Sequence, residues 1–71
     1  MRTIEIRSGE DTIRLGQLLK LADAVPSGAQ VKDVLAAGEV QVNGEPEDRR
    51  GRQVHRGDVV SVAGQEDLQV S

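Results

Sequence analysis

Four arginines lie within eight residues in the second half of the sequence: Arg49, Arg50, Arg52 and Arg56, with no acidic residue among them. A guanidinium stays charged at neutral pH and presents a fork of N–H donors that matches the oxygens of a phosphate. The chain as a whole has a formal net charge of -3, so this run forms a local basic edge on an acidic protein. The run predicts an anionic partner, and nucleic acid is the first candidate. The alternative is a solvated charged edge that only prevents strand-to-strand aggregation.

Further basic residues stand near the expected helices, at Arg14, Lys20 and Lys32. On helical spacing, Arg14 lies about 100° from the apolar stripe that contains Leu15, and Lys32 lies at a similar angle from Val31. Both cations could therefore flank a groove between two helices and face outward. Because ions screen charges over about 8–10 Å at ordinary salt, such a patch could bind phosphate despite acidic residues elsewhere.

The sequence contains no Phe, Tyr or Trp. Its core must therefore be aliphatic, and modules that stack single-stranded bases on aromatic side chains are disfavoured. If the protein binds RNA, we expect it to recognise phosphates, sugars and the shape of structured RNA.

Residues for catalysis are sparse, and we expect no enzymatic activity, no cofactor and no small-molecule substrate. One His and no Cys exclude a zinc site, and a phosphate-binding Gly-rich motif is missing. His55 stands among arginines that disfavour its imidazolium, and we expect no carboxylate beside it. Asp58 follows Gly57, so we expect its carboxylate to cap a turn by accepting backbone N–H groups. The remaining acids are scattered at spacings that do not suggest an acid/base pair.

A length of 71 residues predicts one domain, spanning 1–71. The absence of Cys fits a reducing compartment, and the sequence has no apolar run of membrane-spanning length. We therefore expect a cytoplasmic monomer that does not contact a membrane.

Apolar periodicity in the first half predicts a strand over Thr3–Arg7, a turn over Ser8–Thr12 that ends in helix-capping residues, and a helix over Ile13–Ala22. After Pro26, we expect Ser27 to cap a second helix in a capping box with Gln30. Gly38 suits the left-handed residue that ends this helix. The short connection predicts an αα-hairpin, and we expect Leu18 and Leu35 to meet in the aliphatic core.

Alternation and turn residues in the second half predict four short strands. Asn43-Gly44 suits a type I′ hairpin turn, and Pro46 places its strand at a sheet edge. The expected strands are Val40–Val42, Glu45–Glu47, Val59–Val62 and Leu68–Val70.

Read in order, these residues resemble a known family. The pattern is Arg14-Leu15-x-x-Leu18, Ser27, Gly38-x-Val40-x-Val42-Asn43-Gly44 and Val54-x-x-Gly57-Asp58-x-Val60. It is similar to the S-four (S4) RNA-binding domain, named for a ribosomal protein, and it covers roughly residues 13–62. The chain most resembles the short bacterial proteins that consist of this domain alone.

The resemblance implies an α+β fold in which an αα-hairpin packs on a small, mostly antiparallel sheet. It also implies that structured RNA, ribosomal or transfer RNA, is contacted by the helix pair and the adjoining loop. Two positions depart from the larger members, which usually carry Asp at position 16 and Arg at position 28, where this chain has Gly. We therefore expect Arg49, Arg50 and Arg52 to form one phosphate-binding edge. The full set of predicted RNA-binding residues is Arg14, Lys20, Lys32, Asn43, Arg49, Arg50, Arg52 and Arg56.

A second function stays open from the sequence. The basic edge could serve a protein-interaction module or assembly factor whose partner is an acidic protein. In that case nucleic acid should not compete for the same arginines.

Overall fold

The computed structural model describes residues 1–6 and 9–71. Arg7 and Ser8, the end of the predicted first strand and the start of the predicted turn, lie outside the described residues. The elements, in chain order, are β1 (Arg2–Ile4), β2 (Thr12–Arg14), α1 (Leu15–Leu21), α2 (Gly28–Ala36), β3 (Val40–Val42), β4 (Glu45–Pro46), β5 (Gln53–His55), β6 (Val59–Val62) and β7 (Leu68–Val70).

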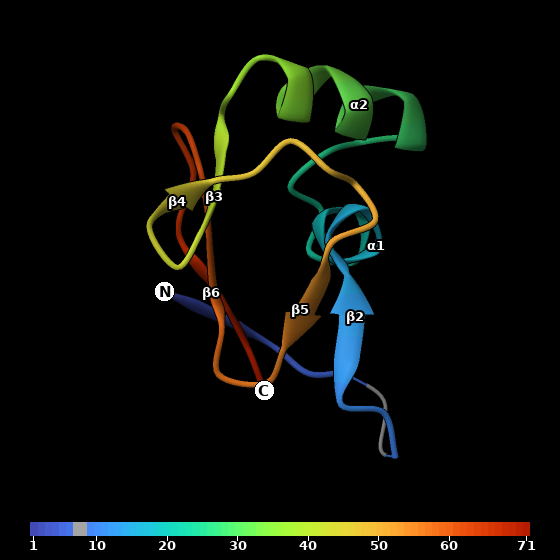
Figure 1. Cartoon of the computed structure of the whole chain (residues 1–71), viewed down its shortest axis with the longest axis vertical. Coiled ribbons are helices and arrows are strands. Elements are labelled where there is room, and N and C mark those ends of the chain that lie inside the picture. Colours follow the sequence, from blue (N-terminus) through green and yellow to red (C-terminus); the bar gives the residue numbers. More distant parts are fainter. Residues whose placement is uncertain (7–8) are drawn as a thin grey trace.

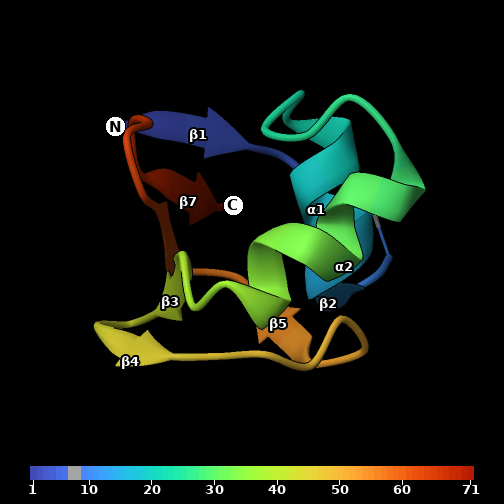
Figure 2. The ribbon, with the colours of Figure 1, turned by 90° about the horizontal axis from the view of Figure 1, so that it is seen from above.

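Five of these strands form one sheet, in the order β1-β7-β6-β3-β4. Its pairs are antiparallel except for β1 and β7, which run parallel. Strands β2 and β5 form a separate antiparallel ribbon. The helix pair and this ribbon lie on one side of the molecule, and the larger sheet lies on the other (Figures 1 and 2). The predicted α+β fold, with an αα-hairpin and a mostly antiparallel sheet, is confirmed.

The hairpin between β3 and β4 has the predicted turn. Asn43 and Gly44 both adopt positive φ, at 52° and 84°, as a type I′ turn requires. The register pairs Val42 with Glu45, and β4 is the edge strand of the sheet. Pro46 lies in this edge strand, where its missing N–H breaks no internal ladder.

The first helix begins later than predicted. Thr12, Ile13 and Arg14 form a strand that pairs with His55, Val54 and Gln53. The prediction that Thr12 ends a turn as a helix cap, with helix from Ile13, is therefore wrong. The β-branched Thr12 and Ile13 suit an extended strand, and a partner strand remote in sequence supplies the hydrogen bonds.

The second helix begins and ends where the sequence predicts, although not by the predicted cap. Ser27 is the N-cap and Gly38 takes the left-handed conformation, at φ 73°. Within the described residues the Ser27 side chain makes no capping hydrogen bond, so the predicted capping box is wrong. The N–H of Gln30 instead bonds the Ser27 backbone carbonyl at 3.2 Å.

An aliphatic core joins the helices to both sheets. Leu15, Leu18 and Leu19 of α1 are fully buried, and Leu35 of α2 is 2 % exposed. The same cluster includes valines of β3, β5 and β6, Ile4 of β1, and Leu68 and Val70 of β7. Leu18 and Leu35 are therefore both core residues, as predicted. Within residues 1–6 and 9–71, neither helix has the length and apolar character needed to cross a bilayer.

We predict that Gly44→Val destabilises the protein by about 1–2 kcal/mol, because a branched side chain is strained at positive φ. A Cβ at this position would meet no atom within 4 Å, so the effect isolates backbone strain from crowding. Gly28→Ala is the control, since its Cβ also enters open space and its φ is not in the positive range. Equal urea midpoints for wild type and Gly44→Val would contradict the turn.

We also predict that Leu18→Ala costs about 2–5 kcal/mol, because it leaves a cavity in the core. Leu21→Ala is the matched control on the same helix, since Leu21 is 58 % exposed and surface truncations usually cost less than about 0.5 kcal/mol. Thermal unfolding of the two variants tests the inward face of α1. A similar midpoint for both would mean that this face is misassigned.

Candidate nucleic-acid interface

An open pocket of about 520 Å³ lies between α1 and the 47–52 loop, the segment that connects β4 to β5. Three of its lining residues are cations, Arg14, Lys20 and Arg50, and none of the described residues that line it is acidic. We call this surface the basic pocket; its lining residues are Arg14, Gly16, Gln17, Lys20, Arg50 and Gly51. Three cations without a carboxylate among them favour an anionic ligand over a cationic one.

Helical spacing brings the α1 side of the basic pocket together. Arg14 is the N-cap of α1, and Gln17 and Lys20 follow at steps of three residues. Residues at i and i+3 lie on one face of a helix, so all three border the same side. This face is opposite in character to the Leu15 and Leu18 face, which is fully buried.

The 47–52 loop docks on the first turn of α1 through its backbone. The N–H of Leu15 donates to the Arg52 carbonyl at 2.8 Å, and the N–H of Gly16 donates to the Arg50 carbonyl at 2.9 Å. The first N–H groups of a helix have no partner within the helix, and the described residues show no side-chain cap here. The loop therefore acts as the cap of α1, and the hydrogen bond from Gly16 to the Arg50 carbonyl places Arg50 at the pocket.

Gly16 permits this close approach. A Cβ at position 16 would lie 3.3 Å from Cγ1 of Val31 and 3.4 Å from both Cβ and the carbonyl of Arg50. An added Cβ would therefore be crowded by the Val31 side chain of α2 and would be in van der Waals contact with the loop at Arg50. The glycine that replaces the Asp of larger members thus has a packing role between the helix pair and the loop.

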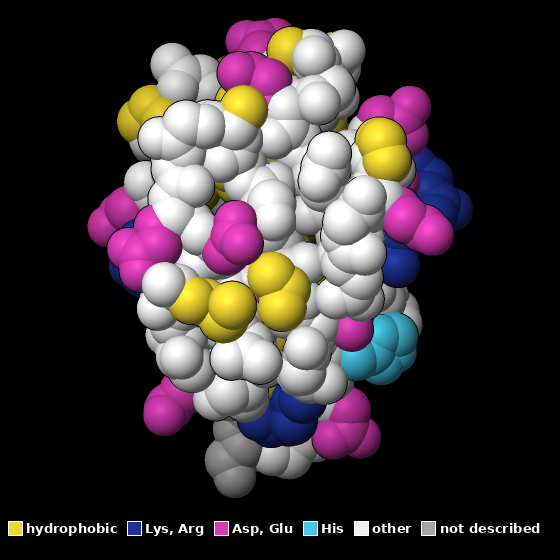
Figure 3. All heavy atoms as spheres, turned by 90° about the vertical axis from the view of Figure 1, so that its left-hand side faces the viewer, with side chains coloured by type: hydrophobic (Ala, Val, Ile, Leu, Met, Phe, Trp, Pro, Cys, Tyr) yellow, Lys and Arg dark blue, Asp and Glu magenta, His cyan; other side chains and the backbone are white. Residues whose placement is uncertain are grey.

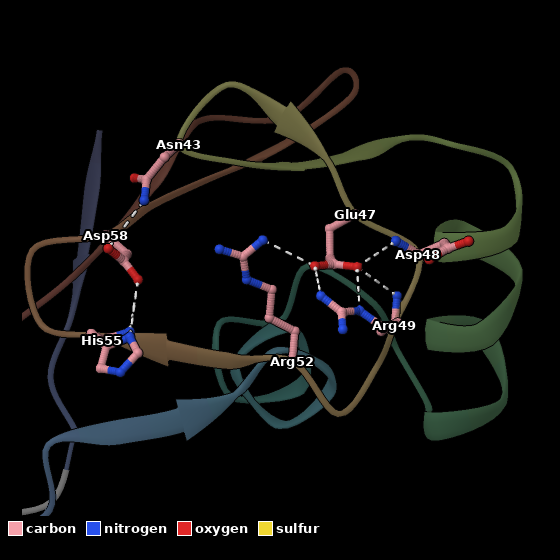
Figure 4. A network of polar contacts seen from close by, with 7 residues as sticks. All are labelled: Asn43, Glu47, Asp48, Arg49, Arg52, His55 and Asp58. Atoms are coloured by element: carbon pink, nitrogen blue, oxygen red, sulfur yellow. Dashed lines mark hydrogen bonds and ion pairs between the residues drawn. The ribbon is translucent and has the colours of Figure 1, made fainter.

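Glu47 organises the other side of the loop (Figure 4). Only 7 % of this residue is exposed. Its Oε2 accepts from the N–H of Asp48 at 3.0 Å, the N–H of Arg49 at 3.1 Å and Nε of Arg49 at 3.2 Å. Its Oε1 accepts from Nη2 of Arg49 at 3.2 Å and Nη1 of Arg52 at 3.0 Å. The carboxylate is therefore held by both ends of the loop.

These donors favour the ionised carboxylate. The side-chain hydrogen bonds from Arg49, its backbone N–H and the Arg52 guanidinium lower the pKa of Glu47 from 4.5 to about 2. In return, Glu47 raises the pKa of Arg49. Arg49 and Arg52 are therefore already paired with the Glu47 carboxylate in the protein without a ligand. Their side chains remain 74 % and 30 % exposed.

The predicted arginine edge is thus divided in the structure. Arg50 lines the basic pocket, whereas Arg49 and Arg52 bond Glu47. Arg56 lies beyond the far end of β5, where its Nη2 donates to the Glu10 carbonyl at 2.7 Å. Strand β5 separates Arg56 from Arg52, because an extended chain advances roughly 3.3 Å per residue.

Lys32 and Asn43 lie outside the basic pocket. Lys32 is exposed on α2, one residue after the Val31 that packs near Gly16. Asn43 connects two turns, since its Nδ2 donates to Oδ1 of Asp58 at 3.1 Å and its Oδ1 accepts from the N–H of Val59 at 2.9 Å. The Asn43 side chain therefore has a clear structural role.

The expectation that His55 has no carboxylate beside it is wrong. Its Nδ1 lies 3.7 Å from Oδ2 of Asp58, and its backbone N–H donates to the same oxygen at 2.8 Å. Asp58 thus caps the turn, as predicted, and that backbone bond is the main cause of its lowered pKa. In the part of the chain that the structure describes, His, Asp and Glu side chains do not gather in threes that could hold a metal ion.

Sequence reasoning missed Gln17, Gly51 and Glu47. Gln17 stands midway between Arg14 and Lys20 on helical spacing, which is a usable signal. Glu47 precedes Arg49 and Arg52 at short range, but its burial follows from the tertiary fold and has no local signature.

Similarity to known proteins identifies the family of this chain. The sequence profile of the S4 domain matches residues 4–71. The chain belongs to the S4 domain family. A relative from Bacillus subtilis (strain 168), named "Probable ribosome maturation protein RlbA", is 50 % identical over 60 residues, which cover 84 % of each chain. The profile match over residues 4–71 extends the S4 resemblance from residues 13–62 to nearly the whole sequence.

We predict that Glu47 makes this S4 domain sensitive to acid. Because the folded-state pKa is about 2 and the ordinary value is 4.5, the stabilisation is fully present above pH 4.5 and is lost as the pH falls towards 2. Glu47→Gln lacks this titration. The gap between the melting temperatures of wild type and Glu47→Gln should therefore narrow from pH 5 to pH 2.

The comparison with the variant is needed because Asp58 and Glu66 also have lowered pKa values and contribute acid sensitivity to both proteins. A gap that stayed constant between pH 5 and pH 2 would contradict the ion pairs at Glu47.

Proposed function

We propose that this S4 domain protein is a non-catalytic RNA-binding protein that acts on ribosomal RNA. The observation that carries the proposal is the basic pocket, where Arg14, Lys20 and Arg50 converge from a helix and a loop. Phosphates supply the attraction, and the shape of a folded RNA supplies the selectivity.

The composition supports structured RNA over a single strand. The sequence has no Phe, Tyr or Trp on which exposed bases could stack. Proteins that bind single strands without sequence preference do so mainly by stacking bases on aromatic side chains. The absence of aromatic residues therefore favours duplex or hairpin RNA.

Ribosomal RNA is preferred over transfer RNA because the Bacillus subtilis relative is named as a probable ribosome maturation protein. Transfer RNA serves as the competing ligand in the experiment below.

The predicted residues would contribute unequally. The central contacts with RNA come from Arg14, Lys20 and Arg50. Further contacts come from Arg49 and Arg52, whose charge is partly balanced by Glu47. Lys32, Asn43 and Arg56 would act at the periphery, through screened attraction or contacts to RNA that extends beyond the pocket.

We predict that Arg50→Ala and Lys20→Ala each weaken binding to a ribosomal RNA hairpin, Arg50→Ala by about tenfold, because each removes a charged phosphate contact. If three cations each neutralise one phosphate, the logarithmic salt slope is on the order of -2.7, taking duplex DNA as a proxy. Raising salt from 50 to 200 mM then weakens wild-type binding roughly 40-fold, and Arg50→Ala reduces the slope by about one unit.

Lys32→Ala is the matched control for Lys20→Ala, since both remove an exposed helical lysine but Lys32 lies outside the basic pocket. Fluorescence anisotropy with a ribosomal RNA hairpin, a transfer RNA and an unstructured strand measures all four proteins. Equal losses for both lysines would argue against the pocket. Absence of RNA binding by wild type at 50 mM salt would reject the proposed function in favour of an acidic protein partner.

A further inference from the structure

We infer that Glu47 is a positioning residue of the RNA site, which holds the 47–52 loop so that Arg50 faces the basic pocket. The inference rests on the proposed function, because it concerns how that same site is assembled. Glu47 is not assigned a contact with RNA; it acts through Arg49, Arg52 and the backbone between them.

The hydrogen bonds of Glu47 enclose the loop. Its carboxylate bonds the N–H groups of Asp48 and Arg49 at the start of the loop and the Arg52 guanidinium at the end. A carboxylate that accepts at both ends fixes the separation of those ends. Arg50 lies between them, so its backbone position follows from the two anchors.

The opposite side of the loop is fixed by α1. The carbonyls of Arg50 and Arg52 accept from the N–H groups of Gly16 and Leu15. The loop is therefore held between a nearly buried anion and the positive end of a helix. Both anchors use atoms other than the Arg50 side chain, which lines the pocket.

A simple electrostatic role for Glu47 makes the opposite prediction. A carboxylate near a phosphate-binding surface repels RNA and neutralises Arg49 and Arg52, so its removal should tighten binding and steepen the salt dependence. A positioning role requires that its removal weaken binding, although the protein becomes less negative. The direction of the change therefore decides between the two roles.

The experiment compares Glu47→Gln with Asp48→Asn. Both remove one negative charge from the same loop, but Asp48 is exposed and its side chain is not part of the Glu47 network shown in Figure 4. Anisotropy with the ribosomal RNA hairpin, well below both melting temperatures, should give weaker binding for Glu47→Gln by about 2- to 10-fold. Asp48→Asn should bind as well as wild type or better.

Hydrogen exchange at Leu15 and Gly16 reports the loop position without RNA. Their N–H groups bond loop carbonyls, so both should exchange faster in Glu47→Gln than in Asp48→Asn. Unchanged exchange at both amides would overturn the positioning role, whatever the RNA affinity. If Glu47→Gln does not fold, Glu47→Asp is compared with wild type in the exchange measurement, because it keeps the charge and shortens the reach by one methylene; both amides should then exchange faster in the variant.

A double-variant cycle separates this inference from the proposed function. Arg50→Ala should weaken binding less in the Glu47→Gln background than in wild type, because the loop no longer holds Arg50 at the pocket. Additive effects, or tighter binding by Glu47→Gln, would overturn the inference and leave the proposed function intact. Loss of RNA binding by wild type itself would reject both.

Discussion

The arrangement of the molecule depends on one contact, the docking of the 47–52 loop on the first turn of α1. Two backbone hydrogen bonds, from Leu15 and Gly16 to the carbonyls of Arg52 and Arg50, satisfy helix N–H groups that would otherwise lack a partner. The same contact sets the start of α1, aligns β2 with β5 and brings Arg50 to Arg14 and Lys20. A loop that caps a helix and supplies a functional side chain couples stability to the site.

The docked loop adds to the stability of a domain whose hydrophobic core is small. The buried apolar side chains of the described residues are Leu, Ile, Val and Ala, and a chain of this size buries only about 60 % of its unfolded surface. Polar contacts therefore help to fix the conformation of the 47–52 loop. Glu47 is the main example, because its nearly buried carboxylate is satisfied by five hydrogen bonds from the loop that it shapes. A buried anion without these donors would be strongly unfavourable.

The charge pattern shows how an acidic protein can present a basic site. The formal net charge is -3, yet the lining of the basic pocket combines three cations with uncharged residues. The face shown in Figure 3 is mostly uncharged, with a small hydrophobic group below its centre and both acidic and basic side chains around its edge. Because screening limits charge effects to about 8–10 Å, the charges of the two faces influence each other little.

The sequence by itself determined the elements whose signals are local. The Asn43-Gly44 turn, the edge strand with Pro46 and the end of α2 at Gly38 each follow from what one or two residues allow in φ and hydrogen bonding. The apolar stripe of α1 likewise identified its buried face. These local signals predicted the α+β class, and the motifs read together resembled the S4 family, to which the profile match assigns the chain.

Tertiary structure alone decided where contacts join residues remote in sequence. Thr12–Arg14 became a strand because Gln53–His55 lies beside it, and His55 gained a carboxylate because the turn folds Asp58 back. The arginine run predicted one edge. In the structure, strand β5 separates Arg56 from the other arginines, and the ion pairs with Glu47 separate the side chains of Arg49 and Arg52 from that of Arg50. Local sequence fixes backbone preferences over a few residues, whereas burial and partnership depend on the whole chain, and these decide which cations meet.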